Sequence, residues 1–544
     1  MSFLRLTRRM SGALALAVLL VSHVSAQDSV GVALRGLVIG ESDVWRLYAS
    51  RGWAPVWLAG HGLSSQGTAA IAQLRDAASH GLRPNEYATA ALDSAIGRLA
   101  LPGTSAATLA RTDLLLSTAM LQYLEDLHLG RARFAPFSRS PAESIDWPAA
   151  LTEAVAADTV ARLVLASEPR LTQYRNLRAL LIRYRLLAAG PPQPIVPDGP
   201  SVWPGAPYPG TDALRRRLQL EEKLPPASST DRAGVYDDSL AAAVRRFQLR
   251  HGLRPDALLG PQTLAALNTP LAHRVHQIEL ALERLRWLPR LGAQPFVVVN
   301  IPAFELFAFD SAGGSGTPAL TMKVVVGKAL DTRTPMLLEP MRYVEFRPFW
   351  NVPRSILTAE VIPVLRRNAG YLRTHGMELV DKRGRPLGDR VTPDVIRRLA
   401  EGQLRVRQRP GRSNALGLVK FVFPNAADVY MHDTPETDLF SQARRDFSHG
   451  CIRLENPAAL AAWVLRGRTE WTPDRIAAAM TGTETIRVPL TRPMPVAVFY
   501  TTVVAMPDGT ARFYPDIYGR DQTLDELLGS PLTAGTGIAD ASLR

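Results

Sequence analysis

The chain has 544 residues, of which 46% are hydrophobic and 7% aromatic. This composition is typical of a globular protein and excludes a disordered chain, and the length is too great for one core, so we expect about three or four domains. The formal net charge of +13 suits an acidic partner such as nucleic acid, anionic lipid or a bacterial cell wall, and charge alone does not choose among these.

The N-terminus has the three-part layout of a secretory signal. Arg8 and Arg9 precede an apolar run over residues 13–21, and a small-residue cleavage pattern ends at Ala26. The run is shorter than the roughly 20 residues that cross a bilayer. We therefore expect residues 1–26 to be a cleaved signal peptide and the mature protein to be exported; an uncleaved membrane anchor is the alternative.

Residues 27–200 are predicted to form a helical scaffold domain. Apolar residues recur there at helical spacing, as at Leu177, Leu180 and Leu181. The segment shows no catalytic group of residues, so a structural role is expected. A run rich in Pro and Gly over 190–210 ends it, because such a composition does not continue a helix.

Residues 208–270 predict a compact unit of three helices. Asp237 or Asp238 is suited to cap the second helix. The segment also contains, in order, Phe247-Gln248, Gly252-Leu253, Asp256-Ala257 and Gly260-Pro261. This pattern resembles a peptidoglycan-binding domain of the three-helix type; an unrelated three-helix unit is the alternative. Residues 271–293 then predict a connecting helix.

From residue 294 the pattern changes to strands. A continuous run rich in Val over 296–301 is typical of a strand buried on both faces, and a further strand is expected at 418–423. Between these strands, residues 355–410 predict a mainly helical insertion. Near the C-terminus, residues 496–502 predict another strand.

The only cysteine in the chain, Cys451, lies in the motif Ser448-His449-Gly450-Cys451-Ile452-Arg453, 19 positions after His432. A lone cysteine cannot form an intramolecular disulfide, and a cysteine flanked by histidines is a candidate thiolate nucleophile. A thiol with its free pKa of about 8.5 needs a base, and a loop that doubles back would bring His432 beside the sulfur. Gly450 would let backbone amides approach a developing oxyanion, and Arg453 is placed to bind a substrate carboxylate.

Two other interpretations of these residues stay open at this point. A buried free cysteine can act simply as a small hydrophobic side chain. His432, His449 and Cys451 could also bind zinc, which takes nitrogen and sulfur ligands, although no second cysteine or obvious acidic ligand accompanies them.

The spacing of His432 and the cysteine motif resembles the active-site signature of the L,D-transpeptidase catalytic domain (the YkuD type). The chain as a whole is similar to the large YcbB-like L,D-transpeptidases of Gram-negative bacteria. The supporting segments lie at 48–55, 277–289, 299–304, 350–356 and 516–521. The resemblance implies a multidomain α+β protein: a helical scaffold, a three-helix peptidoglycan-binding unit, a β-sandwich catalytic domain over 294–490 with a helical, lid-like insertion at 355–410, and a C-terminal segment at 491–544.

By the same resemblance, Cys451 is the nucleophile and His432 the general base, while His449 and Gly450 shape the site. The residues implied to bind substrate are Ser448, Arg453, Asn456, Tyr430 and Trp350, with core packing an equal alternative for the last two. The role of Asp433 stays open.

The implied reaction forms 3→3 cross-links between diaminopimelate residues of peptidoglycan stems through a cysteine thioester, with release of D-alanine. It would take place in the periplasm and serve wall organisation and cell shape. The resemblance implies no cofactor, no metal and no nucleic acid. Donor and acceptor peptidoglycan stems are the expected partners; membrane proximity and other wall-synthesis enzymes are compatible with the resemblance. Carbapenems are expected to acylate Cys451. An L,D-carboxypeptidase, a cysteine peptidase and a non-catalytic wall-binding protein are the alternatives.

Overall fold

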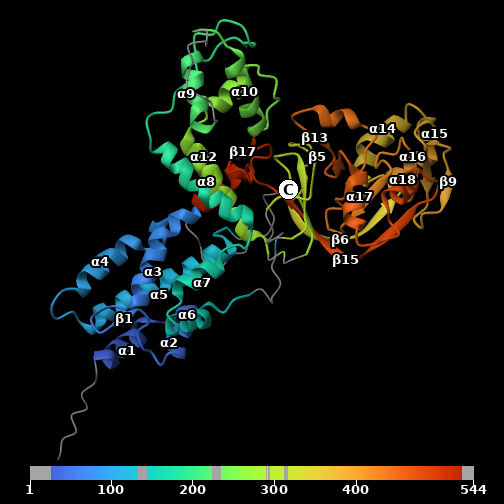
Figure 1. Cartoon of the computed structure of the whole chain (residues 1–544). Coiled ribbons are helices and arrows are strands. Elements are labelled where there is room, and N and C mark those ends of the chain that lie inside the picture. The colour runs from blue at the N-terminus through green and yellow to red at the C-terminus, as the bar shows by residue number, and fades with distance from the viewer. Residues whose placement is uncertain are drawn as a thin grey trace, which may run out of the picture. The chain divides into compact units, whose positions relative to one another are not determined.

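The computed structural model describes residues 26–132, 137, 144–222, 234–289, 291, 294–311 and 316–529 (Figure 1). The predicted signal peptide lies outside these residues except for Ala26. Contacts divide the chain into two compact units. The first is built from the described parts of Met1–Arg75, Pro84–Tyr123 and Asp146–Val164. The second is built from the described parts of Asp76–Arg83, Leu124–Ile145 and Leu165–Arg544. Within the described ranges, no helix combines the length and the apolar character that a membrane span requires.

The first unit is helical, as predicted for the scaffold. Its elements, in whole or in part, are α1 (Ala26–Leu37), α2 (Asp43–Ser50), β1 (Leu58–Ala59), β2 (Gly62–Leu63), α3 (Ser65–Asp76), the turn Pro84–Tyr87, α4 (Thr89–Leu99), α5 (Ala106–Leu129), α6 (Trp147–Ala156) and α7 (Val160–Ser167). Asp113 on α5 is fully buried and accepts hydrogen bonds from the Val56 and Trp57 amides at 2.9 and 2.8 Å. The Tyr48 hydroxyl donates a third bond to it at 2.7 Å. Because a buried carboxylate needs such partners, this cluster fixes the segment before β1 on α5.

The second unit contains the predicted three-helix unit. α9 (Thr211–Glu221), α10 (Asp238–Arg250) and α11 (Pro261–Asn268) enclose a core that includes Leu218, Val244, Phe247 and Leu264. Asp237 is the N-cap of α10 and accepts a hydrogen bond from the Leu240 amide at 2.8 Å. The buried Gln248 side chain accepts from the Ala257 amide at 2.8 Å. These bonds fix both ends of α10, so the cap predicted at Asp237 or Asp238 is Asp237.

Helix α12 (Leu271–Trp287) carries paired charges in the interior of the second unit, where it packs along α8 (Thr172–Ala188). Arg284 Nη1 lies 2.5 Å from Asp521 Oδ1, and Arg286 Nη1 lies 2.9 Å from Glu283 Oε2. Both arginines are at most 1% exposed. Buried charges are costly unless they are paired, and Asp521 belongs to α19 (Arg520–Gly529). The pairing therefore ties the C-terminal helix to α12.

A nine-stranded sheet forms the region predicted as a β-sandwich. Its strands run in the order β13-β5-β14-β12-β11-β6-β15-β3-β4, and β4 also pairs with β5, so the sheet closes on itself. Their bounds are β3 (Phe296–Asn300), β4 (Glu305–Phe309), β5 (Leu320–Gly327), β6 (Leu337–Phe346), β11 (Val419–Val422), β12 (Met431–His432), β13 (Asp446–Ser448), β14 (Ile452–Leu454) and β15 (Ile486–Phe499). α17 (Pro457–Leu465) and α18 (Pro473–Thr481) pack on the same apolar core through Leu460 and Ile476.

Strand β15 crosses the boundary expected at residue 490. It pairs with β6 in antiparallel fashion and with β3 in parallel fashion. Residues 491–499 of the expected C-terminal segment are therefore part of the closed sheet, and the strand expected at 496–502 is its end. The segment continues as a hairpin of β16 (Val503–Ala505) and β17 (Ala511–Phe513), followed by α19.

The insertion holds the predicted helices and also contains short strands that were not predicted. The helical parts are α13 (Arg354–Ile356), a π-helical turn (Leu357–Val361), α14 (Ile362–Leu365), α15 (Tyr371–Thr374) and α16 (Pro393–Ala400). A separate four-stranded sheet has the order β7-β10-β8-β9, formed by Trp350–Asn351, Arg405–Gln408, Met377–Val380 and Pro386–Gly388. Strands of two to four residues are too short to show a period in the sequence, which is why the prediction missed them.

Candidate active site

Neighbouring strands place the polar residues of the site on one face of the closed sheet. In the register, Lys420 on β11 is opposite His432 on β12, and His432 is level with Arg453 on β14. Cross-strand partners share a face, and so do residues two apart along a strand. Tyr430 and Cys451 precede β12 and β14 directly, so they lie on this face as well. The alternate side chains face the core and are fully buried: Phe421, Met431 and Ile452.

Cys451 is a free, partly buried thiol. Its Sγ lies 3.9 Å from the carbonyl oxygen of Asp428. Burial raises the pKa of the Cys451 thiol, whereas hydrogen bonding with Tyr430 and the positive charge of Lys420 act to lower it. The described residues contain no group of three or more His, Cys, Asp or Glu arranged to hold a metal ion.

His432 is 4% exposed and fixed by its neighbour in sequence. Its Nδ1 lies 2.5 Å from the backbone oxygen of Asp433. A carbonyl oxygen only accepts, so Nδ1 carries the proton of the neutral ring and Nε2 is left as the acceptor. Burial lowers the pKa of His432 to about 3, the bond to Asp433 opposes this, and the charges of Arg453 and Lys420 lower it further. The imidazole is therefore neutral at pH 7 and able to take a proton, although no hydrogen bond joins it to the thiol among the described residues.

The role of the Asp433 side chain, which the sequence left open, is set by backbone amides. Its carboxylate accepts hydrogen bonds from the Leu418 amide at 2.8 Å and the Thr434 amide at 2.7 Å. A Cβ at Gly417 would lie 2.4 Å from this carboxylate. Asp433 therefore fixes the backbone just before β11 and just after β12, and through its carbonyl it orients His432.

The turn before Cys451 is held by its own hydrogen bonds. Gly450 has a φ of +113°, which lies in the region that favours glycine. Its amide donates to Ser448 Oγ at 3.1 Å, and Ser448 Oγ donates to Cys451 O at 2.6 Å. Thr334 Oγ1 donates to Gly450 O at 2.8 Å. Ser448 is 2% exposed, so its hydroxyl positions the turn, and the geometry favours this over the expected contact with substrate.

Three other predicted residues have partners within the protein. His449 Nε2 lies 2.6 Å from Glu360 Oε1, on the π-helical turn of the insertion. Arg453 Nη1 lies 2.5 Å from Glu436 Oε2, next to the short helix Thr437–Ser441. Asn456 is the N-cap of α17, where its Oδ1 accepts from the Ala459 amide at 3.1 Å.

The two aromatic residues of the prediction lie in different places. Tyr430 lies beside the base, with its ring centroid 5.8 Å from that of His432, and Lys420 Nζ lies 3.9 Å from the centroid of the Tyr430 ring. Trp350 instead lies in strand β7, level with Gln408, and packs against the separate core of the insertion. The structure thus brings Tyr430 to the thiol and assigns Trp350 to the packing of the insertion.

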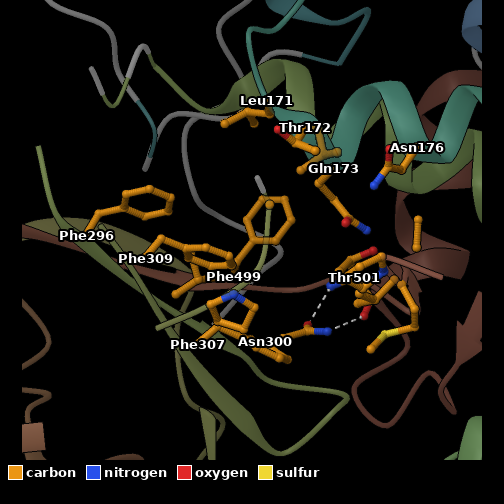
Figure 2. Close-up of a pocket in the computed structure, with 18 of the residues that line it drawn as sticks. Leu171, Thr172, Gln173, Asn176, Phe296, Asn300, Phe307, Phe309, Phe499 and Thr501 are labelled. Carbon is orange, nitrogen blue, oxygen red and sulfur yellow. Dashed lines mark hydrogen bonds between the residues drawn. The ribbon is translucent and has the colours of Figure 1, made fainter. Parts of the chain in front are cut away.

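An apolar cavity of about 250 Å³ lies elsewhere in the second unit, between the start of α8 and strands β3, β4 and β15 (Figure 2). Phe296, Phe307, Phe309 and Phe499 line it, and Asn300 at its edge exchanges two hydrogen bonds with the backbone of Thr501. Neither Cys451 nor His432 is among its lining residues. The reactive groups thus lie outside this apolar cavity.

Three family models match separate parts of the chain. A "Scaffold domain" matches residues 42–181, a "Putative peptidoglycan binding domain" matches 209–267, and an "L,D-transpeptidase catalytic domain" matches 294–484. The last range contains both Cys451 and His432. The chain carries an L,D-transpeptidase catalytic domain. This confirms the resemblance drawn from the cysteine motif and from the three-helix pattern.

A curated relative supports the L,D-transpeptidase domain. A protein of Haemophilus influenzae named "Putative L,D-transpeptidase" is 30% identical over 249 residues, which is 46% of this chain and 49% of the relative. The chain thus spans about half the length of that relative. The crystal structure of the L,D-transpeptidase (residues 123–326) from Xylanimonas cellulosilytica is 17% identical and covers 56% of this chain and 99% of its own, but with a TM-score of 0.17 it carries no argument on the fold.

Sequence reasoning missed two charged residues of the L,D-transpeptidase domain. Lys420 has a visible signal, because it interrupts the apolar run Leu418-Val419-Lys420-Phe421, but only the register shows that it faces His432. Glu360 has no such signal. Its contact with His449 joins positions 89 residues apart, and a single sequence does not reveal such a pairing.

Proposed function

We propose that the protein is an L,D-transpeptidase that forms 3→3 cross-links between diaminopimelate residues of peptidoglycan stems. The observation that carries the proposal is the match of residues 294–484 to the catalytic domain, within which a free thiol and a neutral, oriented imidazole lie on one face of neighbouring strands. This pairing is what a cysteine acyl transferase requires. The peptidoglycan-binding match over 209–267 supports the choice of polymer.

In the proposed first step, Cys451 Sγ attacks the carbonyl carbon of the third stem residue of a tetrapeptide. The thiol proton passes to His432 Nε2, which then gives it to the amine of the departing D-alanine. The products are free D-alanine and a thioester on Cys451. The Cys451 amide makes no hydrogen bond among the described residues, so it is the amide best placed to stabilise the oxyanion, while the Gly450 amide is already bonded to Ser448.

In the proposed second step, the side-chain amine of a neighbouring diaminopimelate attacks the thioester. His432 takes a proton from this amine and returns it to the departing sulfur, which restores the thiol. Water in place of the amine would give a trimmed tripeptide, the product of an L,D-carboxypeptidase. The secretory pattern over residues 1–26 and the +13 charge support action on the anionic wall in the periplasm.

The decisive experiment is mass spectrometry of muropeptides made by the purified protein from a tetrapeptide substrate. We expect 3→3 dimers, release of D-alanine and a thioester adduct on the intact protein. The Cys451→Ala variant should make none of these and still bind purified sacculi. Tripeptide without dimer would identify a carboxypeptidase, and no product from the unaltered protein would favour a non-catalytic wall-binding role.

A further inference from the structure

Lys420 is a partly buried cation on the face of the site. It lies on β11 opposite His432, and it is only partly exposed. Its Nζ lies 3.9 Å from the centre of the Tyr430 ring. Within the part of the chain that the structure describes, Lys420 forms no ion pair. A cation in such a place interacts strongly with any anion that forms nearby, because the effective dielectric is lower than in water.

The other charged groups that face this region already have partners. Glu345 is opposite Lys420 on β6, but it pairs with Arg487 on β15 at 3.0 Å. Arg453 on β14 pairs with Glu436, and His449 in the turn pairs with Glu360.

The remaining titratable groups do not supply a positive charge. His432 on β12 is neutral at pH 7, and Tyr430 before it keeps its proton because burial raises its pKa. Asp428 presents its carbonyl oxygen to the thiol. Lys420 is therefore a positive charge that no ion pair holds within the described site. Burial lowers the pKa of its ammonium group, while the charges of Glu345 and Asp428 act to raise it.

We propose that Lys420 is an electrostatic positioning residue whose ammonium group stabilises the anionic sulfur that Cys451 forms during attack. The inference rests on the proposed role of Cys451 as the nucleophile. In the step concerned, the S–H bond breaks, its proton bonds to His432 Nε2, and the electron pair left on sulfur attacks the carbonyl carbon. Lys420 stays protonated throughout and exchanges no atom with the substrate.

The test is the pH dependence of alkylation of the single cysteine in the full-length protein. Iodoacetamide reacts with the thiolate of Cys451, and intact-mass spectrometry measures the fraction of protein that carries the alkyl group. We expect Lys420→Met to raise the apparent pKa of the thiol by about one unit, so that alkylation at a fixed lower pH slows about tenfold. Lys420→Arg keeps the charge and should keep the profile. Lys323→Met is the matched control, since Lys323 lies on β5 of the same sheet and contacts Phe440 O.

A profile for Lys420→Met that matches those of the unaltered protein and Lys323→Met would overturn the inference. If Lys420→Met does not fold, the inference is tested on the unaltered protein by comparing its alkylation rates with iodoacetate and with iodoacetamide. A cation beside the thiol makes anionic iodoacetate react faster, relative to neutral iodoacetamide, than it does with free cysteine; an equal or smaller ratio would reject the role. Alkylation needs no stem peptide, so a shifted profile without cross-linked product would reject the proposed function and retain the effect of Lys420.

Discussion

At the scale of single residues, the site combines a thiol that burial keeps protonated with a base that burial keeps neutral. The pKa of Cys451 is raised and that of His432 is lowered. A resting thiolate–imidazolium pair is therefore not the state that the surroundings favour. The proton moves when the sulfur attacks, and the bond from His432 Nδ1 to Asp433 O keeps the acceptor nitrogen ready for it.

Replacing His432 by Gln should remove a loss of stability at acid pH. The pKa of His432 is about 3 in the folded protein and about 6.5 in an unfolded chain. Between these values the unfolded chain binds a proton that the folded protein does not, so folding stability falls as the pH decreases, by up to about 1.4 kcal/mol per pH unit. Thermal unfolding from about pH 7 to about pH 4 should show a smaller loss for His432→Gln than for the unaltered protein. Parallel losses would contradict the lowered pKa.

Replacing Ser448 by Ala should slow the reaction without weakening substrate binding. The variant loses both hydroxyl bonds that hold the turn at Cys451, and misplacement of a reacting group costs about tenfold or more in rate. Steady-state kinetics should show a lower kcat with KM unchanged. Ser441→Ala removes an exposed hydroxyl bonded to Asp438 O and should change neither. A raised KM at full kcat for Ser448→Ala would instead indicate contact with substrate.

At the scale of elements, the insertion meets the cysteine turn through one described side-chain pair, Glu360 and His449. The pair comes from the π-helical turn Leu357–Val361, and such turns are frequent at functional sites. The two side chains are 53% and 37% exposed. Solvent therefore screens the pair, and its contribution to folding stability is small.

A double-mutant cycle with Glu360→Gln and His449→Gln should measure that small contribution. We expect a coupling free energy below about 1 kcal/mol from thermal unfolding, because exposed ion pairs contribute little. A coupling well above about 1 kcal/mol would show that the contact contributes more than an exposed ion pair does.

The sequence was most informative where a pattern is local. The motif around Cys451 and the Val-rich run at 296–301 predicted the thiol site and a buried strand, and the capping acid before α10 predicted the start of that helix. Contacts set by register or tertiary packing were not predictable. The position of Lys420 opposite His432 depends on strand pairing, and the sheet of the insertion consists of strands too short to show alternation.

At the scale of the second unit, the charges of α12 hold the C-terminal helix. Replacing Arg284 by Met should leave Asp521 as a buried carboxylate without its ionic partner and lower the free energy of unfolding by about 3–5 kcal/mol. Chemical denaturation measures the change. Arg397→Met serves as the control, since Arg397 forms exposed pairs with Asp394 and Glu401 and should cost under about 1 kcal/mol. Equal effects in the two variants would contradict a structural role for the Arg284 pair.

The position of β15 also bears on how the protein is made. This strand fills the place between β6 and β3, and its partner β3 lies about 200 residues earlier, with Val498 paired to Val299. Until a ribosome has produced residue 499, the sheet is open between β6 and β3 and its apolar interior is exposed to water. Pairings this distant in sequence form slowly. The strands that carry the thiol site can pair with one another earlier, but the sheet closes only once residue 499 has been synthesised.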